Sequence, residues 1–475
     1  MTGDRSESRD SADGEDLRKR LAPFGQEHLL AGWNSLSAEM RQKLARQIRG
    51  IDFARIDRLL RSQAAQHDWA ALARRAEPPR AVRLDGRGNT HTALEARRRG
   101  EELLRAGKVG VVLVAGGQGT RLGFDHPKGC YSIGPVSGAS LFQILLEKTL
   151  AASRRYGVSI PLYLMTSPAT HEETISFLEV HRRFGLPQSD VTVFCQGTMP
   201  AVDAATGKVL LAGRGCISLS PDGHGGMPAA LRGSGALDDL RRRGIEQLFY
   251  MQVDNPLVSI CDAEFIGYHA LAGSELSTQV VAKHHPLDRV GNVVSVDGQV
   301  RIIEYSDLPD DAARQRLPDG SLKLWAGNCA IHVFSVELLA RASSGEGELP
   351  FHLARKKVPY VDQRGALTEP AEPNAIKFEQ FIFDLLPVAS QPLVVEVDEA
   401  ACFAPVKNAP GAERDSPERV QAQMIALHRR WLEAAGTRIA PGVAVEISPL
   451  FALDADEVRQ KAKLTGEVKE SLYFK

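Results

Sequence analysis

The chain has 475 residues, more than one domain usually holds, so two or three domains are expected. Apolar residues make up 43% of the chain, and 58 basic against 59 acidic residues leave a net charge of -1. This balance argues against a nucleic-acid partner, which would favour a basic excess. No apolar run approaches the roughly 20 residues that span a bilayer, so no membrane partner is expected. The six cysteines are scattered without a CxxC pair, which predicts free thiols and a cytoplasmic location.

The N-terminal part of the chain is charged at first and then helical in pattern. Residues 1–20 are short of aromatic side chains and lack the apolar core of a secretory signal, so they are predicted to form a disordered tail. From residue 21 to residue 107, apolar residues recur at spacings of three and four, as in "HLLAGWNSLSAEMRQKLARQI". This spacing predicts a helical N-terminal region.

From Val109 the pattern changes to strands that alternate with helices. "VGVVLVAGG" is a short β-branched run typical of a strand buried on both faces of a parallel sheet. Ser140, followed three residues later by Gln143, predicts a capping box at the start of the next helix. Further strands are predicted at "PLYLMT", "VTVFCQ" and "IEQLFYMQVDNP", with helices at "ATHEETISFLEVHRRFG", "ALDDLRRRG" and "DAEFIGYHALAG".

This alternation predicts an α/β fold with a doubly wound nucleotide-binding sheet over residues 108–396. Residues 397–475 read as a small C-terminal α+β domain, with a helix at "SPERVQAQMIALHRRWLEAAG" and a strand in "GVAVEISPLFAL". Ligands of such sheets bind beyond the carboxyl ends of the strands. The residues expected at the ligand are therefore those that follow strands, namely Gly116 onward, Thr166, Gln196 and Asp254.

A glycine-rich turn, "LVAGGQGTRLGFDHPKG", follows the first predicted strand. Glycines let the backbone approach a phosphate closely. The turn is not a P-loop, because GxxxxGK[ST] is absent, and its GxGxxxG spacing does not fit a dinucleotide fingerprint. That spacing argues against a nicotinamide oxidoreductase. A tight turn without a ligand is the alternative, but the cations Arg121 and Lys128 in the same segment suit a polyphosphate.

The same segment resembles the signature of the sugar nucleotidyltransferases, and within them the eukaryotic-type uridylyltransferases that include the UDP-N-acetylhexosamine pyrophosphorylases. Further segments resemble that family in its own order, and the resemblance runs from about Gly25 to Leu450. They are "GQEHLLAGWN", "QGTMPAV", "SPDGHGG", "QVDNPLV", "RIIEYSDL", "AGNCAIHVF", "PNAIKFEQFIFD", "FAPVKNA" and "VEISPL".

The resemblance implies an enzyme that forms a UDP-sugar and pyrophosphate from UTP and a sugar 1-phosphate, chiefly N-acetylglucosamine 1-phosphate. It implies one Mg²⁺ ion, held by Asp254. The residues expected at the phosphates are Arg121, Lys128, Lys377 and Lys407. Those expected at the nucleotide are Gly116, Gly117, Gln196 and Gly223, and those expected at the sugar are His224, Gly291, Glu304, Asn328 and Phe381.

Several of these residues have simpler explanations when taken alone. Asp254, Asn255 and Pro256 all favour a turn. A lysine such as Lys377 or Lys407 is most often solvent-exposed, Gln196 could be a solvated loop amide, and Phe381 could be a core aromatic. No partner chain is implied, and a monomer is expected.

His224 departs from the family pattern, because N-acetylhexosamine enzymes carry Asn within the "PDG-x-GG" segment. An imidazole is larger than the amide and donates or accepts at one nitrogen at a time. This departure keeps a UDP-glucose or broad-specificity UDP-sugar pyrophosphorylase as an alternative. A catalytically inactive UDP-sugar-binding protein is a second alternative, but the four cations expected at the phosphates and the expected metal ligand Asp254 are all present.

Overall fold

The computed structural model describes residues 4–61, 69–344, 349–362, 365–462 and 466–475. They form two compact units. One comprises Met1–Asp68, Gly197–Gly226 and Leu349–Ile382, and the other comprises Trp69–Gln196, Met227–Glu348 and Phe383–Lys475. These units do not follow the predicted boundaries at residues 107 and 396. The helices up to residue 61 instead share a unit with two segments that were expected inside the catalytic domain, while residues 69–107 belong to the larger unit.

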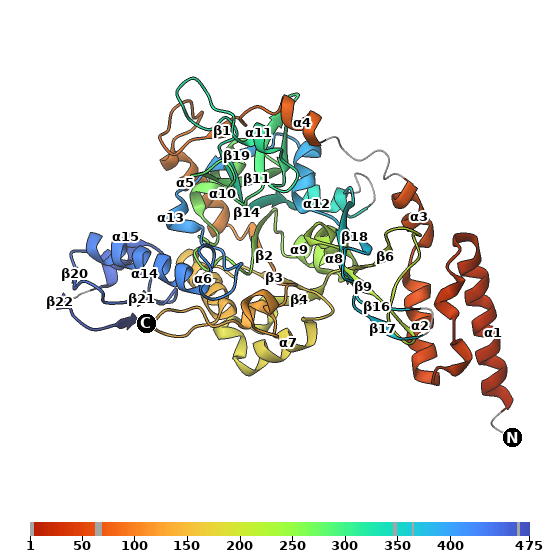
Figure 1. Cartoon of the computed structure of the whole chain (residues 1–475). Coiled ribbons are helices and arrows are strands. Elements are labelled where there is room, and N and C mark those ends of the chain that lie inside the picture. The colour runs from red at the N-terminus through yellow and green to blue at the C-terminus, as the bar shows by residue number, and fades with distance from the viewer. Residues whose placement is uncertain (1–3, 62–68, 345–348, 363–364, 463–465) are drawn as a thin grey trace. The chain divides into compact units, whose positions relative to one another are not determined.

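The larger unit is built on a mixed β-sheet, and Figure 1 labels its strands β1, β2, β3, β4, β11, β14 and β19. Its strand order is β1–β19–β11–β14–β10–β2–β3–β4. The bounds are β1 Ala81–Val82, β19 Leu393–Glu396, β11 Leu276–Ala282, β14 Ala326–Ser335, β10 Gln247–Gln252, β2 Val109–Val114, β3 Leu162–Thr166 and β4 Val191–Cys195. The α/β fold and the four strands predicted up to β10 are confirmed.

In the main strand order of this sheet, β14 runs against the other strands. β14 is antiparallel to both β10 and β11, while β10, β2, β3 and β4 are mutually parallel. A hairpin of β12 (Asn292–Val296) and β13 (Gln299–Ile303) extends from β14. Because β2, β3, β4 and β10 are parallel neighbours, the loops that follow them emerge at one edge of the sheet.

Helices of the larger unit follow the strands largely as predicted. They are α4 Trp69–Arg75, α5 Ala93–Arg105, α6 Leu141–Tyr156, α7 His171–Val180, α8 Met227–Gly233, α9 Ala236–Arg242, α10 Ala263–Leu271, α11 Asp310–Ala313, α12 Val336–Ala342 and α13 Glu399–Cys402. At the start of α6, Ser140 accepts a hydrogen bond from the Gln143 N–H at 3.1 Å. The Gln143 side chain instead donates to Glu147 at 2.9 Å, so only half of the predicted capping box forms.

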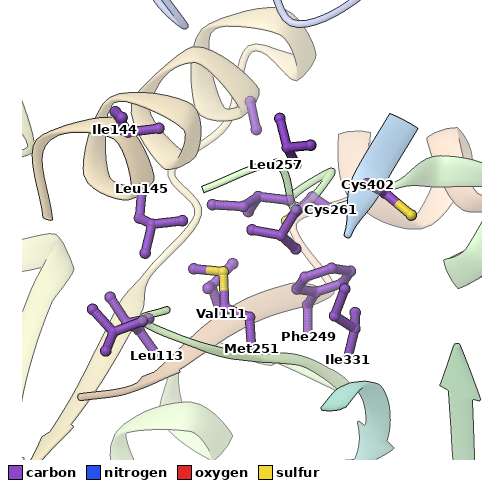
Figure 2. Packing of buried hydrophobic residues seen from close by; sticks show 14 of the residues in the cluster. Val111, Leu113, Ile144, Leu145, Phe249, Met251, Leu257, Cys261, Ile331 and Cys402 are labelled. Carbon is purple, nitrogen blue, oxygen red and sulfur yellow. The ribbon is translucent and has the colours of Figure 1, made fainter. Parts of the chain in front are cut away.

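Apolar side chains of the sheet and of α6 form the main core, part of which is drawn in Figure 2. Burying each large aliphatic or aromatic side chain contributes roughly 1.5–3 kcal/mol. The labelled members include Val111 and Leu113 of β2, Phe249 and Met251 of β10, Ile331 of β14, and Ile144 and Leu145 of α6. This core fixes β2 and β10, the two strands that carry the glycine loop and Asp254.

The segment predicted as a disordered tail contains a helix, α1, over Asp4–Leu21; residues 1–3 lie outside the described residues. Leu17 and Leu21 of α1 are fully buried among the apolar residues of the smaller unit. This burial gives the helix a tertiary partner that composition alone does not reveal. The remaining helices of this unit are α2 Ala38–Gly50 and α3 Phe53–Arg61.

Short strands complete the smaller unit. A three-stranded antiparallel sheet has the order β15–β18–β6, and β5 pairs with β9. Ile376 and Phe378 of β18 pack among the helices, so Lys377 between them lies on the opposite face. The bounds are β5 Thr198–Pro200, β6 Val202–Asp203, β7 Leu211–Gly213, β8 Cys216–Ile217, β9 Leu219–Pro221, β15 His352–Lys356, β16 Tyr360–Val361, β17 Leu367–Thr368 and β18 Ala375–Glu379.

The C-terminal segment belongs to the larger unit and has a small apolar core of its own. The predicted helix is α14, Pro417–Ala434, and the predicted strand is β21, Val445–Ile447. The remaining elements are β20 Arg438–Ile439, α15 Ala455–Lys461, β22 Glu467–Val468 and β23 Leu472–Phe474. None of the helices in the described residues is long and apolar enough to cross a membrane.

Candidate active site

The glycine loop folds back on itself directly after β2. The Gly119 N–H donates to the His126 carbonyl at 2.9 Å, and the Lys128 N–H donates to the Gly117 carbonyl at 3.1 Å. A Cβ atom at Gly119 would lie 2.7 Å from the Phe124 carbonyl oxygen, so only glycine fits there. Gly117 has open space around it, which leaves its backbone accessible. The loop therefore places Lys128 beside an exposed glycine backbone.

Gln196 lies against Gly116, although the two residues are 80 positions apart in the chain. A Cβ atom at Gly116 would be 2.7 Å from the Gln196 Oε1 atom. Gln196 is buried, so it is not a solvated loop amide. The Ser167 hydroxyl, which the sequence interpretation missed, donates to the Gly116 carbonyl at 2.7 Å. The structure thus brings two predicted nucleotide residues together where β2 and β4 end.

Lys128 and Asp254 form an ion pair at this edge of the sheet. The Lys128 Nζ and Asp254 Oδ2 atoms are 3.5 Å apart, and the side chains are only 17% and 13% exposed. The pairing follows from topology, because β10 lies beside β2 and the Val253 N–H donates to the Val114 carbonyl at 3.0 Å. The Asn255 side-chain amide stabilises the same turn by donating a hydrogen bond to the Cys402 carbonyl at 2.8 Å.

The segment that contains Lys407 packs against this turn. The Val406 N–H donates to the Asp254 carbonyl at 2.8 Å, and the Lys407 N–H donates to the Asp415 carbonyl at 2.9 Å. Burial raises the pKa of the Asp415 carboxyl, and the nearby Asp254 adds to the rise, while Lys407 and Lys128 oppose it. Lys128, Asp254, Lys407 and Asp415 therefore form one charge cluster.

Asp415 was missed in the sequence, where it stands eight positions beyond Lys407 with no motif around it. Its left-handed backbone, with φ of 53°, is a signal that only the structure provides. Arg121, on a 3₁₀ turn of the glycine loop, is exposed, and its side chain has no hydrogen bond or ion pair within the described ranges. Its guanidinium is thus available to a ligand.

Three residues predicted at the sugar also lie together in the larger unit. The Asn328 N–H donates to the Gly291 carbonyl at 2.8 Å. A Cβ atom at Gly291 would be 3.0 Å from the Glu304 Oε1 atom and 3.7 Å from the Asn328 Cβ atom. The Asn328 side chain accepts hydrogen bonds from Thr278 and from the Ala330 N–H. The antiparallel β14 and the β12–β13 hairpin bring these residues together.

The other predicted residues lie in the smaller unit. Gly223 has a φ of 88°, and a Cβ atom there would be 2.4 Å from the Gln380 carbonyl oxygen. The His224 ring stacks on Phe381 with centroids 5.5 Å apart. Phe381 is half-buried rather than part of the core. Its ring also packs against the ring of His352, with the two ring centroids 4.4 Å apart. Lys377 on β18 has no ion-pair or hydrogen-bond partner for its side chain among the residues that the structure describes.

His224 is held in one protonation state. The Ile382 N–H donates to the His224 Nδ1 atom at 3.2 Å, so Nδ1 is the acceptor and Nε2 carries the proton. Burial, and then the neighbouring His352, lower the pKa of His224 to about 4. The imidazole is therefore neutral near pH 7 and presents a single N–H donor.

The charge cluster offers two carboxylates to a metal ion. Asp254 and Asp415 offer carboxylate oxygens, the ligands that this hard cation prefers, and Mg²⁺ usually takes one or two protein carboxylates beside substrate phosphates. No group of three or more His, Cys, Asp or Glu side chains suited to a metal occurs in the described part of the chain. The residues present fit a metal that depends on substrate for its remaining ligands.

Comparison with known proteins places the chain in a family. Residues 56–458 match the family described as UTP–glucose-1-phosphate uridylyltransferase. The chain is 37% identical to UDP-N-acetylhexosamine pyrophosphorylase-like protein 1 of Xenopus tropicalis, over 91% of this chain and 87% of that protein. It is 36% identical to UDP-N-acetylglucosamine pyrophosphorylase of Saccharomyces cerevisiae, over 94% of this chain and 96% of the other.

A solved structure shares the fold over most of the chain. The uridine diphosphate N-acetylglucosamine pyrophosphorylase from Trypanosoma brucei, in complex with an inhibitor, superimposes with a TM-score of 0.81 at 28% identity, over 94% of each chain. The resemblance found in the sequence is thereby confirmed. The chain belongs to the UTP–glucose-1-phosphate uridylyltransferase family and is a uridylyltransferase.

Proposed function

We propose that this enzyme forms UDP-N-acetylglucosamine and pyrophosphate from UTP and N-acetylglucosamine 1-phosphate. The names of its relatives support this sugar, and the cluster of Lys128, Asp254 and Lys407 beside the glycine loop carries the proposal. The lysines lie beside an exposed glycine backbone. Such a site can bind a nucleoside triphosphate and a second, phosphate-bearing substrate together.

The chemistry requires charge neutralisation rather than a general base. The attacking group is a phosphate oxygen of the sugar phosphate, which is already ionised at neutral pH. Two unit charges about 4 Å apart repel by about 4 kcal/mol at an effective dielectric constant near 20. Phosphoryl-type transfer therefore depends on positioning and electrostatic stabilisation.

Each cation has a proposed role in this transfer. Arg121 and Lys128 contact the phosphates that leave as pyrophosphate, while Lys377 and Lys407 neutralise the incoming sugar phosphate and the α-phosphate of UTP. Asp254, with Asp415 beside it, would hold Mg²⁺, which supplies positive charge to the phosphates when bound. Gln196 reads the uracil edge, because its amide can donate and accept at once. Gly116, Gly117 and Gly223 contribute backbone groups.

The sugar would meet Gly291, Glu304, Asn328, His224 and Phe381. A UDP-glucose or broad-specificity activity is the second candidate, and the neutral, single-donor His224 favours it over a strict N-acetylhexosamine enzyme. A panel of sugar 1-phosphates with UTP, followed by pyrophosphate release, distinguishes the two. A kcat/KM highest for N-acetylglucosamine 1-phosphate supports the proposal, and equal values across hexose 1-phosphates refute it.

A variant at His224 tests its part in sugar selection. In His224→Asn we expect the kcat/KM ratio of N-acetylglucosamine 1-phosphate to glucose 1-phosphate to rise by up to about tenfold, because one neutral hydrogen bond is worth about 0.5–1.5 kcal/mol. His91→Asn is a matched control, since this histidine stands just before the N-cap of α5 and has no place in the proposed site. An unchanged ratio would remove His224 from the sugar site.

We also propose that the enzyme works in the cytoplasm. All six cysteines are free thiols, and burial raises the pKa of Cys130 to about 12, which disfavours its reactive thiolate. Fluorescence microscopy of the tagged full chain tests this location, and export from the cytoplasm would contradict it.

A further inference from the structure

The motif "VEISPL" has no part in the proposed chemistry, yet it carries a buried carboxylate. Glu446, in the middle of β21, is only 3% exposed. Its Oε2 atom accepts hydrogen bonds from the Val136 N–H at 2.8 Å and the Ser137 N–H at 2.7 Å. Its Oε1 atom accepts from the Ser137 hydroxyl at 2.7 Å. A strand near the C-terminus therefore holds a loop that lies about 310 positions earlier in the chain.

The loop, Tyr131–Ser140, is shaped to receive this carboxylate. Two consecutive backbone N–H groups form a concave anion site, and hydrogen bonds to a charged acceptor are stronger than neutral ones. A Cβ atom at Gly134 would lie 2.9 Å from the Glu446 Oε1 atom and 2.4 Å from the Ser137 hydroxyl oxygen. Glycine at this position is what allows the loop to close around Glu446.

The same loop is the direct continuation of the turn that carries Lys128. The Tyr131 N–H donates to the Lys128 carbonyl at 3.0 Å, and the Leu141 N–H donates to the Tyr131 carbonyl at 3.0 Å. Next to Lys128, a Cβ atom at Gly129 would be 2.3 Å from the Phe142 ring, so the turn sits tightly on α6. The Tyr131–Ser140 loop thus joins Lys128 to the first turn of α6, and Glu446 fixes the tip of the loop.

We propose that Glu446 is a positioning residue for the catalytic loop: β21 holds the Tyr131–Ser140 loop in place and thereby sets where Lys128 meets the phosphates of UTP. This proposal rests on the proposed role of Lys128. It gives the C-terminal segment a part in the reaction, although none of the residues proposed to contact substrate lies beyond Asp415.

A double-mutant cycle on the full chain tests the proposal. Glu446→Gln keeps the side-chain size but loses the charge, and only one of its two terminal atoms, the amide oxygen, can still accept hydrogen bonds from the loop. We expect this variant to lower kcat/KM for UTP about tenfold or more. In a Lys128→Met background, the same substitution should change kcat/KM by less than twofold, because two residues that act through one contact are not additive.

The outcomes distinguish the positioning role of Glu446 from the proposed role of Lys128 itself. If Lys128→Met loses activity and the two effects multiply, Glu446 does not act through Lys128 and the positioning role is refuted. If Lys128→Met alone matches the wild type, the proposed role of Lys128 fails first and the positioning role falls with it. A purely structural weakening would lower kcat/KM in both backgrounds alike.

Two further variants keep the test decisive. Ser137→Ala removes one of the three hydrogen bonds that Glu446 accepts. We expect kcat/KM for UTP to fall about threefold when this substitution is made in the wild type, and not to fall further when it is added to Lys128→Met. These two measurements decide the question if Glu446→Gln does not fold. Glu457→Gln is the matched control, because this C-terminal carboxylate pairs with Arg155 at 2.8 Å. Its kcat/KM should equal the wild-type value, and a loss as large as that of Glu446→Gln would overturn the proposal.

Discussion

Replacing Lys128 with methionine should remove most of the activity while leaving the fold intact. In the free enzyme, the Lys128 ammonium lies 3.5 Å from the Asp254 carboxylate, and both side chains are largely shielded from water. A phosphate oxygen at a comparable distance would gain about 4 kcal/mol from this charge at an effective dielectric constant near 20. Since each 1.36 kcal/mol is tenfold in rate, the loss predicted for kcat/KM is about a thousandfold.

The assay is pyrophosphate release at saturating N-acetylglucosamine 1-phosphate, with UTP varied. Lys128→Arg keeps the charge and serves as the matched control, so it should retain far more activity than Lys128→Met. Thermal melting of both variants checks that the fold survives. The electrostatic reasoning is refuted if Lys128→Met stays within about tenfold of the wild type, or if the arginine variant is as inactive as the methionine variant.

Two further predictions concern the fold around the site. Gly100→Ala on α5 should destabilise the protein by about 3 kcal/mol or more, because the new methyl would lie 1.8 Å from the Ala263 carbonyl oxygen. The control Gly50→Ala, a helical position with nothing within 4 Å, should be neutral or stabilising in urea melts, and equal effects would contradict the packing argument. Lys148 donates to the Pro256 and Val258 carbonyls, and burial lowers its pKa to about 7. Between pH 7 and the ordinary lysine pKa, Lys148 is protonated in the unfolded chain but largely neutral in the folded protein. Its contribution to the free energy of unfolding therefore rises with pH over this range, by up to about 1.4 kcal/mol per pH unit. Lys148→Met should flatten that rise between pH 7 and 9, and parallel curves for the two proteins would refute the assignment.

The residues of the glycine loop show how much of the site the sequence predicts. Gly117, Gly119 and Lys128 lie in one short segment after a strand, so local chemistry and the alternation of strands and helices sufficed to place them at the carboxyl edge of the sheet. Asp254 and Gln196 followed from the same rule, because loops after parallel strands meet at that edge. The roles assigned to these residues stay predictions.

Other features depend on residues that are far apart in the chain. Ser167 and Asp415 carry no local motif, and the segment "VEISPL" does not reveal what Glu446 binds, so each of the three is identified only by the group that folding brings against it. The helix at Asp4–Leu21 was predicted as a tail, because its charged composition does not reveal that Leu17 and Leu21 become buried. The antiparallel direction of β14, which helps to bring Gly291, Glu304 and Asn328 together, is likewise not evident from its segment "AGNCAIHVF".

The sequence by itself therefore determined the α/β class, the glycine loop and the charged residues available for phosphate chemistry, because these depend on periodicity and side-chain type. Only the tertiary structure decided which charges become neighbours and which backbone groups hold them. The free energy of an ion pair such as Lys128–Asp254 depends on distance and burial, and both are set by the packing of β2 against β10.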